Sequence, residues 1–272
     1  PDRYQVITGT AQPVRDAHRI RTHLGDHRAT VNDNTEDLAV LSVMGPNART
    51  LLSRLTDTDL SLAGFPIFSF RQLRLGSVLV RAARLSYIGE LGWELYTPAT
   101  DAGRLYDTLL ESGTDLGLTD AGAFALTSLR IEKGFRSWGH DVTPDDTLLE
   151  AGLAFTVRKD TSIPFVGQAA VEAQRTAGVK RRFLFFMLRD PDVWPLGGEP
   201  ILRGDQIVGQ VMSAAYGHTL GCSFAMGYVA LDGMTAGKAA ELDYAIEIAL
   251  EPHTASASLK PFFDPSGERM RR

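Results

Sequence analysis

The sequence predicts an α+β fold in which α/β subdomains precede a small antiparallel β-barrel. Up to about residue 133, helix-like and strand-like apolar patterns take turns along the chain. Beyond about residue 180, short strand-like runs alternate with glycine-rich turns, and almost no helical pattern remains. The length of 272 residues suits two domains of ordinary size. We expect the first domain at residues 1–165 and the barrel at residues 166–272, with the boundary falling between about 160 and 180.

The first domain is expected to begin with a strand and to contain one sheet. Residues 4–10 alternate as a strand does, and residues 37–115 predict a mixed sheet with helices packed on one side. The other expected strands lie at 37–43, 66–75, 77–87 and 92–97, and the expected helices at 12–24, 47–55, 100–113 and 119–133. Thr119 or Asp120 can cap the last of these helices, and Gly134 is expected to end it.

The second domain is expected to follow a short helix that ends near Gly178. A strand is expected at 181–188, and the pair Gly204-Asp205 between two apolar runs indicates a hairpin. Two more strands are expected at 224–231 and 241–250. These runs predict a small antiparallel barrel, and a substantial helix within 195–250 would contradict it.

Composition argues against several classes of function. The formal net charge is −5, whereas nucleic-acid binding needs a clustered excess of Lys and Arg. No apolar run approaches the ~20 residues that a membrane helix needs. The single Cys222 cannot form an internal disulfide, and no secretory leader opens the chain. We therefore expect a cytoplasmic protein, or a mitochondrial matrix protein if the source is eukaryotic. The start at Pro1, without Met, leads us to expect a processed chain or a piece of a longer polypeptide.

The stretch from Ser86 to Tyr96 is the most unusual part of the sequence. It places two glycines and two carboxylates, Glu90 and Glu94, at a strand–turn–strand junction. Glycine permits close backbone approach to a ligand, and a carboxylate can accept two parallel N–H bonds from a planar amino-heterocycle. The spacing alone favours a simpler interpretation, in which both glutamates are solvated turn residues and Tyr87 and Trp93 belong to the core.

A second candidate stretch runs from Ser128 to Asp141. Arg130 and Glu132 are two residues apart on a helix, so they cannot face each other, and we expect one of them to point inward and to be paired. Structural pairing is the simpler interpretation, and catalysis is the alternative. Trp138 and His140 could line a cleft or pack against the barrel. The six histidines are dispersed, so no metal site is expected.

The run Tyr87–Glu94 resembles the Y-x-G-E-x-G-x-E signature of the glycine-cleavage T-protein (aminomethyltransferase) superfamily. Further segments resemble that family in the same order, at 128–141, 147–153, 165–167, 225–229 and 261–265. The most similar branch is the C-terminal folate-binding portion of the dimethylglycine and sarcosine dehydrogenases, which residues 6–12, 130–140 and 267–270 resemble.

The resemblance implies aminomethyltransferase-like, folate-binding α/β subdomains and a C-terminal barrel around a central channel. It implies that Glu94 holds the pterin ring of folate and that Tyr87 lies beside it, and we expect Trp138 to project into the same channel. The family transfers a one-carbon unit from a small amine, or from the iminium left by flavin oxidation, to tetrahydrofolate, which becomes 5,10-methylenetetrahydrofolate. FAD would be bound by a separate upstream domain.

Two departures from the family pattern bear on activity. The catalytic aspartate of the family lies upstream of the position of Pro1, so the first part of the folate domain is expected to be missing and the catalytic residue of this chain is unknown. We therefore expect the chain alone to bind folate without turning over an amine. Leu126 stands where the T-protein has an arginine, which agrees with the dehydrogenase branch.

Two alternatives stay open within this resemblance. One is a non-catalytic folate-binding protein, such as a folate-dependent iron–sulfur assembly factor. That branch carries a cysteine after the Lys-Gly pair at the helix end, whereas this chain has Phe135 after Lys133-Gly134. The other is a folate-dependent demethylase of the same superfamily, which the sequence does not exclude.

Overall fold

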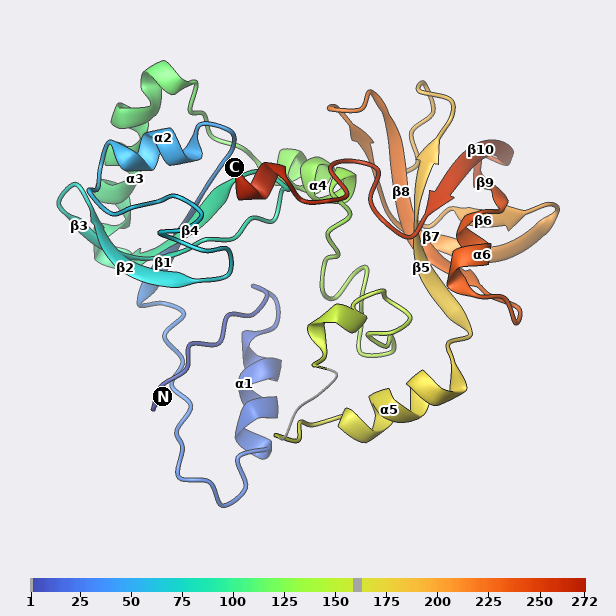
Figure 1. Ribbon diagram of the computed structural model, residues 1–272, viewed down its shortest axis with the longest axis horizontal. Helices are drawn as coiled ribbons and strands as arrows, with labels where there is room; N and C mark the ends of the chain where they lie inside the picture. The colour runs from blue at the N-terminus through green and yellow to red at the C-terminus, as the bar shows by residue number, and fades with distance from the viewer. Residues whose placement is uncertain (1, 159–162) are drawn as a thin grey trace.

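The computed structural model describes residues 2–158 and 163–272. Residues 159–162, which are part of the expected domain boundary, lie outside the described residues, and the division after residue 165 stays a prediction. Figure 1 shows a sheet with two helices at one side of the molecule and a barrel at the other, with helix α4 (Ala123–Glu132) between them. None of the helices within the described ranges is long and apolar enough to cross a membrane.

The sheet of the first domain has four strands in the order β1-β4-β3-β2, and every neighbouring pair is antiparallel. The strands are β1 (Leu38–Met44), β2 (Phe70–Leu75), β3 (Val78–Ala83) and β4 (Gly92–Pro98). Their positions agree with the sequence pattern, but the expected mixed sheet is wrong. Only residues 76–77 join β2 to β3, and only residues 84–91 join β3 to β4. A parallel pair needs a crossover of a dozen or more residues.

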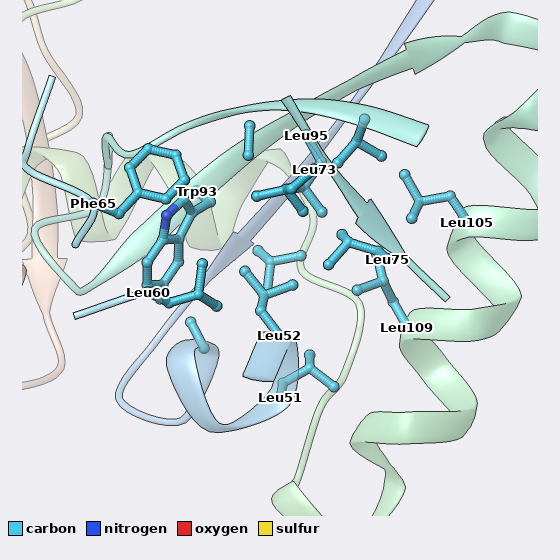
Figure 2. Close-up of a cluster of buried hydrophobic side chains, with 14 of the residues drawn as sticks. Leu51, Leu52, Leu60, Phe65, Leu73, Leu75, Trp93, Leu95, Leu105 and Leu109 are labelled. Carbon is cyan, nitrogen blue, oxygen red and sulfur yellow. The ribbon is translucent and has the colours of Figure 1, made fainter. Parts of the chain in front are cut away.

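Two helices cover one face of this sheet, as expected. They are α2 (Ala48–Ser53) and α3 (Ala102–Gly113). Their leucines pack against buried sheet residues in the core that Figure 2 shows, and they are Leu51, Leu52, Leu105 and Leu109. Trp93 of β4 is fully buried in this core. Successive side chains of a strand point to opposite faces, so Glu94 lies on the face of the sheet away from the two helices.

The strand expected at residues 4–10 is wrong. Residues 4–10 form no strand, and Tyr4 and Val6 are 77% and 65% exposed. The alternating pattern is present, but a strand is stable only when its backbone groups pair with a neighbour. Helix α1 (Pro13–Thr22) follows as expected, although none of its side chains is buried.

Helix α4 begins later than expected and ends where expected. Its N-cap is Gly122, and neither Thr119 nor Asp120 caps it; the Asp120 carboxylate instead accepts a hydrogen bond from Tyr106 at 2.8 Å. At the other end, Gly134 has a φ of +75°, which glycine adopts without strain. The amide of Phe135 closes the helix by donating to the carbonyl oxygen of residue 130 at 2.8 Å.

The second domain is a closed antiparallel barrel, as predicted, and helix α5 (Gln168–Ala177) leads into it and ends at Gly178. Its strands follow the closed order β10-β5-β8-β7-β6-β9 and have these bounds: β5 (Arg181–Leu188), β6 (Pro200–Arg203), β7 (Gln206–Gly217), β8 (Cys222–Ala230), β9 (Asp243–Ile248) and β10 (Glu251–Ser258). The described helix within 195–250 is the five-residue α6 (Ala236–Ala240). Short 3-10 turns lie at Ala99–Asp101, Thr114–Leu116, Ala154–Thr156 and Arg269–Arg271.

Candidate functional site

Glu94 lies in the middle of β4, opposite Ser42 of β1 and Ala83 of β3. It is half-buried, and the neighbouring Tyr96 hydroxyl on the same strand face donates a hydrogen bond to its Oε2 atom. Burial, and then the hydrogen bond to Glu94, raise the pKa of the Tyr96 phenol, so this phenol stays a neutral donor near pH 7. Among the described residues, Glu94 Oε1 accepts no hydrogen bond. One oxygen of the carboxylate is therefore held in place, and the other is available.

Tyr87 lies in the loop between β3 and β4 and is also half-buried. Its hydroxyl donates a hydrogen bond to the Arg136 carbonyl oxygen at 3.0 Å. Its ring stacks on Phe135, with the ring planes 8° apart and the centroids 6.0 Å apart. Burial is the main cause that raises the pKa of the Tyr87 phenol. The loop before β4 is thereby attached to the loop that follows α4.

Trp138 lies in that second loop and is 48% exposed. The Arg15 guanidinium of α1 lies 5.5 Å from the centre of its ring. The structure thus brings Tyr87 against the segment directly before Trp138. No contact recorded in the described residues joins Glu94 to either aromatic side chain, so the shared channel for the three residues stays a prediction.

The charged residues of α4 hold the helix against the barrel. Both Arg130 and Glu132 are buried, whereas the sequence predicted only one inward side chain. Arg130 forms an ion pair with Asp141, which is fully buried, and donates a hydrogen bond to the Ser213 hydroxyl of β7 at 2.9 Å. Glu132 Oε1 accepts hydrogen bonds from the amides of residues 219 and 220 at 3.0 and 2.9 Å. These contacts support the structural interpretation of this pair.

The other acids and histidines of the two stretches differ in their surroundings. Glu90 forms an ion pair with Arg269 near the C-terminus, with Oε1 and Nε 2.6 Å apart. His140 is exposed and lines no described cavity. No cluster of three or more His, Cys, Asp or Glu side chains in the described ranges could hold a metal ion. In the signature stretch, Glu90 is therefore paired with a cation, whereas Glu94 forms no ion pair with any described residue.

A cavity of about 920 Å³ lies elsewhere, between the segment around Asp146 and helix α5. Most of its lining is apolar, and it includes none of the three predicted site residues. The Asp146 carboxylate is already paired with Arg181 at 2.7 Å. The candidate site is therefore the one around Glu94 and Tyr87, and not this cavity.

Sequence reasoning missed two residues of this site. Tyr96 could have been found, because residues i and i+2 of a strand share a face and the expected strand at 92–97 contains both Glu94 and Tyr96. The resemblance included residues 267–270, but nothing in the sequence paired Arg269 with Glu90, because 179 residues separate them.

Comparisons with known proteins cover nearly the whole chain. Residues 1–161 match the GCVT N-terminal domain, and residues 181–264 match the glycine cleavage T-protein C-terminal barrel domain. Human mitochondrial sarcosine dehydrogenase is 39% identical over an alignment of 280 residues, gaps included, which covers 99% of this chain and 30% of that protein. Human mitochondrial dimethylglycine dehydrogenase is 34% identical over 245 residues, which cover 89% of this chain and 28% of that protein. The chain thus spans about 30% of the length of these relatives.

A solved structure confirms the predicted fold. The crystal structure of the glycine cleavage system aminomethyltransferase T from Bartonella henselae matches with a TM-score of 0.79 at 22% sequence identity. The match covers 93% of this chain and 66% of that chain.

Proposed function

The chain belongs to the glycine cleavage T-protein family, and we propose that it is the tetrahydrofolate-binding, one-carbon-transfer module of an enzyme like the flavin-dependent dimethylglycine and sarcosine dehydrogenases. Both family models and both dehydrogenase relatives support this proposal. Under it, FAD belongs to a separate upstream domain, and a small methylated amine is the one-carbon donor. Both relatives are named as mitochondrial proteins. We therefore propose that this protein lies in the mitochondrial matrix if its source is eukaryotic, and in the cytoplasm otherwise.

The observation that carries the proposal is the half-buried Glu94 carboxylate with one oxygen held and one available. A pterin ring presents an amino group and a ring N–H side by side, and a carboxylate accepts such a pair with good geometry. The Tyr96 hydrogen bond fixes the carboxylate, so less conformational entropy is lost when a ligand binds. The residues therefore fit the planar end of a folate.

Two aromatic side chains would complete the site under this proposal. The Tyr87 ring, supported by its stack on Phe135, offers a rigid wall for the folate. Trp138 offers a half-exposed aromatic face that can exclude water from the ligand. Both side chains would orient the folate, and neither would exchange a proton with it.

Bound tetrahydrofolate supplies the nucleophilic nitrogen that accepts the one-carbon unit, and 5,10-methylenetetrahydrofolate is the proposed product. Glu94 orients the ring and provides negative charge close to a cationic donor, which is a form of electrostatic preorganisation. The resemblance assigns the catalytic aspartate to a segment upstream of Pro1, and this assignment is part of the proposal. Glu90 and Asp141 do not replace it readily, since Arg269 and Arg130 already pair with them.

Calorimetry with 5-formyltetrahydrofolate, a stable reduced folate, tests the proposal on the wild type and on Glu94→Gln. Hydrogen bonds to a charged acceptor are worth about 1.5–3 kcal/mol, so we expect the variant to bind roughly 10- to 100-fold more weakly. Glu111→Gln is the matched control, because Glu111 is exposed on α3. Equal affinities for the wild type and Glu94→Gln would remove Glu94 from the site. Absence of binding to the wild type would contradict the proposed function itself.

A further inference from the structure

The C-terminal tail (residues 259–272) leaves the barrel after β10 and crosses to the four-stranded sheet. Figure 1 shows this red segment passing α4 and ending beside the sheet. The tail ends close to the signature turn (residues 87–92), which covers the second half of the β3–β4 connection and the first residue of β4 and contains Tyr87. Three contacts join the tail to α4 and to the neighbourhood of this turn.

The first contact joins the tail to the end of α4. Lys133 Nζ lies 2.8 Å from Asp264 Oδ2, and both side chains are at least nine-tenths buried. The Asp264 carboxylate also accepts hydrogen bonds from the amides of Glu268 and Arg269, at 2.9 and 3.2 Å. Asp264 therefore fixes both the Lys133 ammonium and the backbone of the last turn of the tail.

The second contact joins the tail to the signature turn itself. Arg269 Nε lies 2.6 Å from Glu90 Oε1, and these side chains are 32% and 15% exposed. The Arg269 guanidinium also lies 5.2 Å from the centre of the Phe263 ring, and Lys133 Nζ lies 5.9 Å from the same ring. Two cations thus share one aromatic side chain of the tail.

The third contact lies beside the turn. The buried Arg84, the residue that follows β3, donates a hydrogen bond from Nη2 to the backbone oxygen of Arg272, with the two atoms 3.2 Å apart. The turn also packs closely against the end of α4. A Cβ atom added to Gly89 would lie only 2.6 Å from Cγ of Lys133, the C-cap residue of α4. Gly89 has a φ of +79°, a conformation that glycine alone adopts readily. Asp264 thus contacts both Lys133, which lies against Gly89, and the backbone amide of Arg269, whose side chain pairs with Glu90.

We infer that the C-terminal tail holds the signature turn in the position that ligand binding requires, with Arg269 as a positioning residue. The inference rests on the proposed function, because it assigns the tail a role in folate binding at Tyr87 and Glu94. The Glu90–Arg269 pair is partly exposed, so it contributes little to the free energy of unfolding of the whole chain. Its effect is local: it limits the conformations of the segment that presents Tyr87.

The test uses the full chain with Arg269→Gln, Arg269→Lys, Glu90→Gln and the double variant Glu90→Gln/Arg269→Gln. Arg271→Gln is the matched control, because Arg271 is exposed in the same tail. The two readouts are the affinity for 5-formyltetrahydrofolate and the hydrogen-exchange rates of the amides at 88–92. Residues coupled through one contact have non-additive effects, so the double variant should resemble each single variant.

We expect Arg269→Gln to weaken binding about threefold to tenfold and to accelerate exchange in the signature turn. Arg269→Lys should keep most of the affinity, and Arg271→Gln should match the wild type. Unchanged exchange in Arg269→Gln would overturn the inference, even with weaker binding, since the effect would not pass through the turn. If exchange accelerates but affinity does not change, the tail holds the turn without serving the site, and the inference is again wrong. If the wild type binds no folate, the proposed function fails. The tail then has no role in folate binding, whatever the exchange rates show.

Discussion

The Tyr87 hydroxyl donates a hydrogen bond to the Arg136 carbonyl oxygen at 3.0 Å, and this bond joins the loop before β4 to the loop after α4. Tyr87 and Arg136 are 49 residues apart in the chain. The stack of Tyr87 on Phe135 strengthens the same junction. The two sequence stretches that we singled out therefore meet in one place, and the first prediction concerns this junction.

Tyr87→Phe should lower the free energy of unfolding by about 1 kcal/mol, because it removes one hydrogen bond and keeps the aromatic stack. Tyr87→Ala should cost more, since the stack on Phe135 is lost as well. Urea unfolding of the two variants beside the wild type measures both effects. A Tyr87→Phe chain as stable as the wild type would show that the bond to Arg136 contributes nothing.

Asp141→Asn should lower the free energy of unfolding by about 3 kcal/mol or more. Asp141 is fully buried, and its loss of charge leaves the buried Arg130 without a counter-ion. Asp115→Asn is the matched control: the Asp115–Arg54 pair is exposed and should matter far less. Guanidinium unfolding of both variants provides the comparison, and similar losses would mean that the Arg130–Asp141 pair is not special.

Gly134→Ala and Gly117→Ala should separate backbone strain from steric clash. Both glycines have a positive φ, 75° and 72°. An added Cβ meets nothing within 4 Å at Gly117, but at Gly134 it would lie 2.6 Å from Phe185 Cε1. We expect a loss of about 1 kcal/mol for Gly117→Ala and a further 1–3 kcal/mol for Gly134→Ala. Thermal unfolding of both variants tests this order, and equal losses would contradict the close packing of α4 against the barrel.

The Asp264 carboxylate should make stability depend on pH in the acid range. Burial alone would raise its pKa, but the hydrogen bonds from Lys133 and from two backbone amides outweigh this effect, so its pKa lies below the usual value of 3.8. A depressed pKa in the folded state stabilises the protein fully above the unfolded pKa, and this stability is lost as pH falls through the folded pKa. The stability difference between wild type and Asp264→Asn should therefore be constant near neutral pH and shrink below about pH 4. Urea unfolding across this range tests the sign, with exposed Asp57→Asn as the control. A difference that grows on acidification would contradict it.

The local sequence pattern predicted most elements of the fold. Apolar residues recur with different periods in helices and in strands, and glycine and proline mark where these elements end. It failed where a partner decides the outcome. Residues 4–10 alternate as a strand does but have no neighbouring strand. Strand β10 (Glu251–Ser258) was not predicted, because it begins with Glu251-Pro252-His253 and buries only Ala255. It exists because closing the barrel supplies β5 and β9 as partners on both sides.

The candidate site was predictable to a similar degree. The resemblance to the family signature, and not the spacing alone, indicated Tyr87 and Glu94 as site residues. The orienting hydroxyl of Tyr96 follows from strand alternation alone. The pairing of Glu90 with Arg269 could not be predicted, because it depends on where the barrel places the tail.

A crystal structure of the chain in complex with 5-formyltetrahydrofolate tests the central claim most directly. We expect the amino and ring N–H groups of the pterin about 3 Å from the Glu94 carboxylate, with Tyr87 and Trp138 beside the folate. A pterin ring bound instead in the cavity between Asp146 and α5, or anywhere without contact to Glu94, would contradict the account.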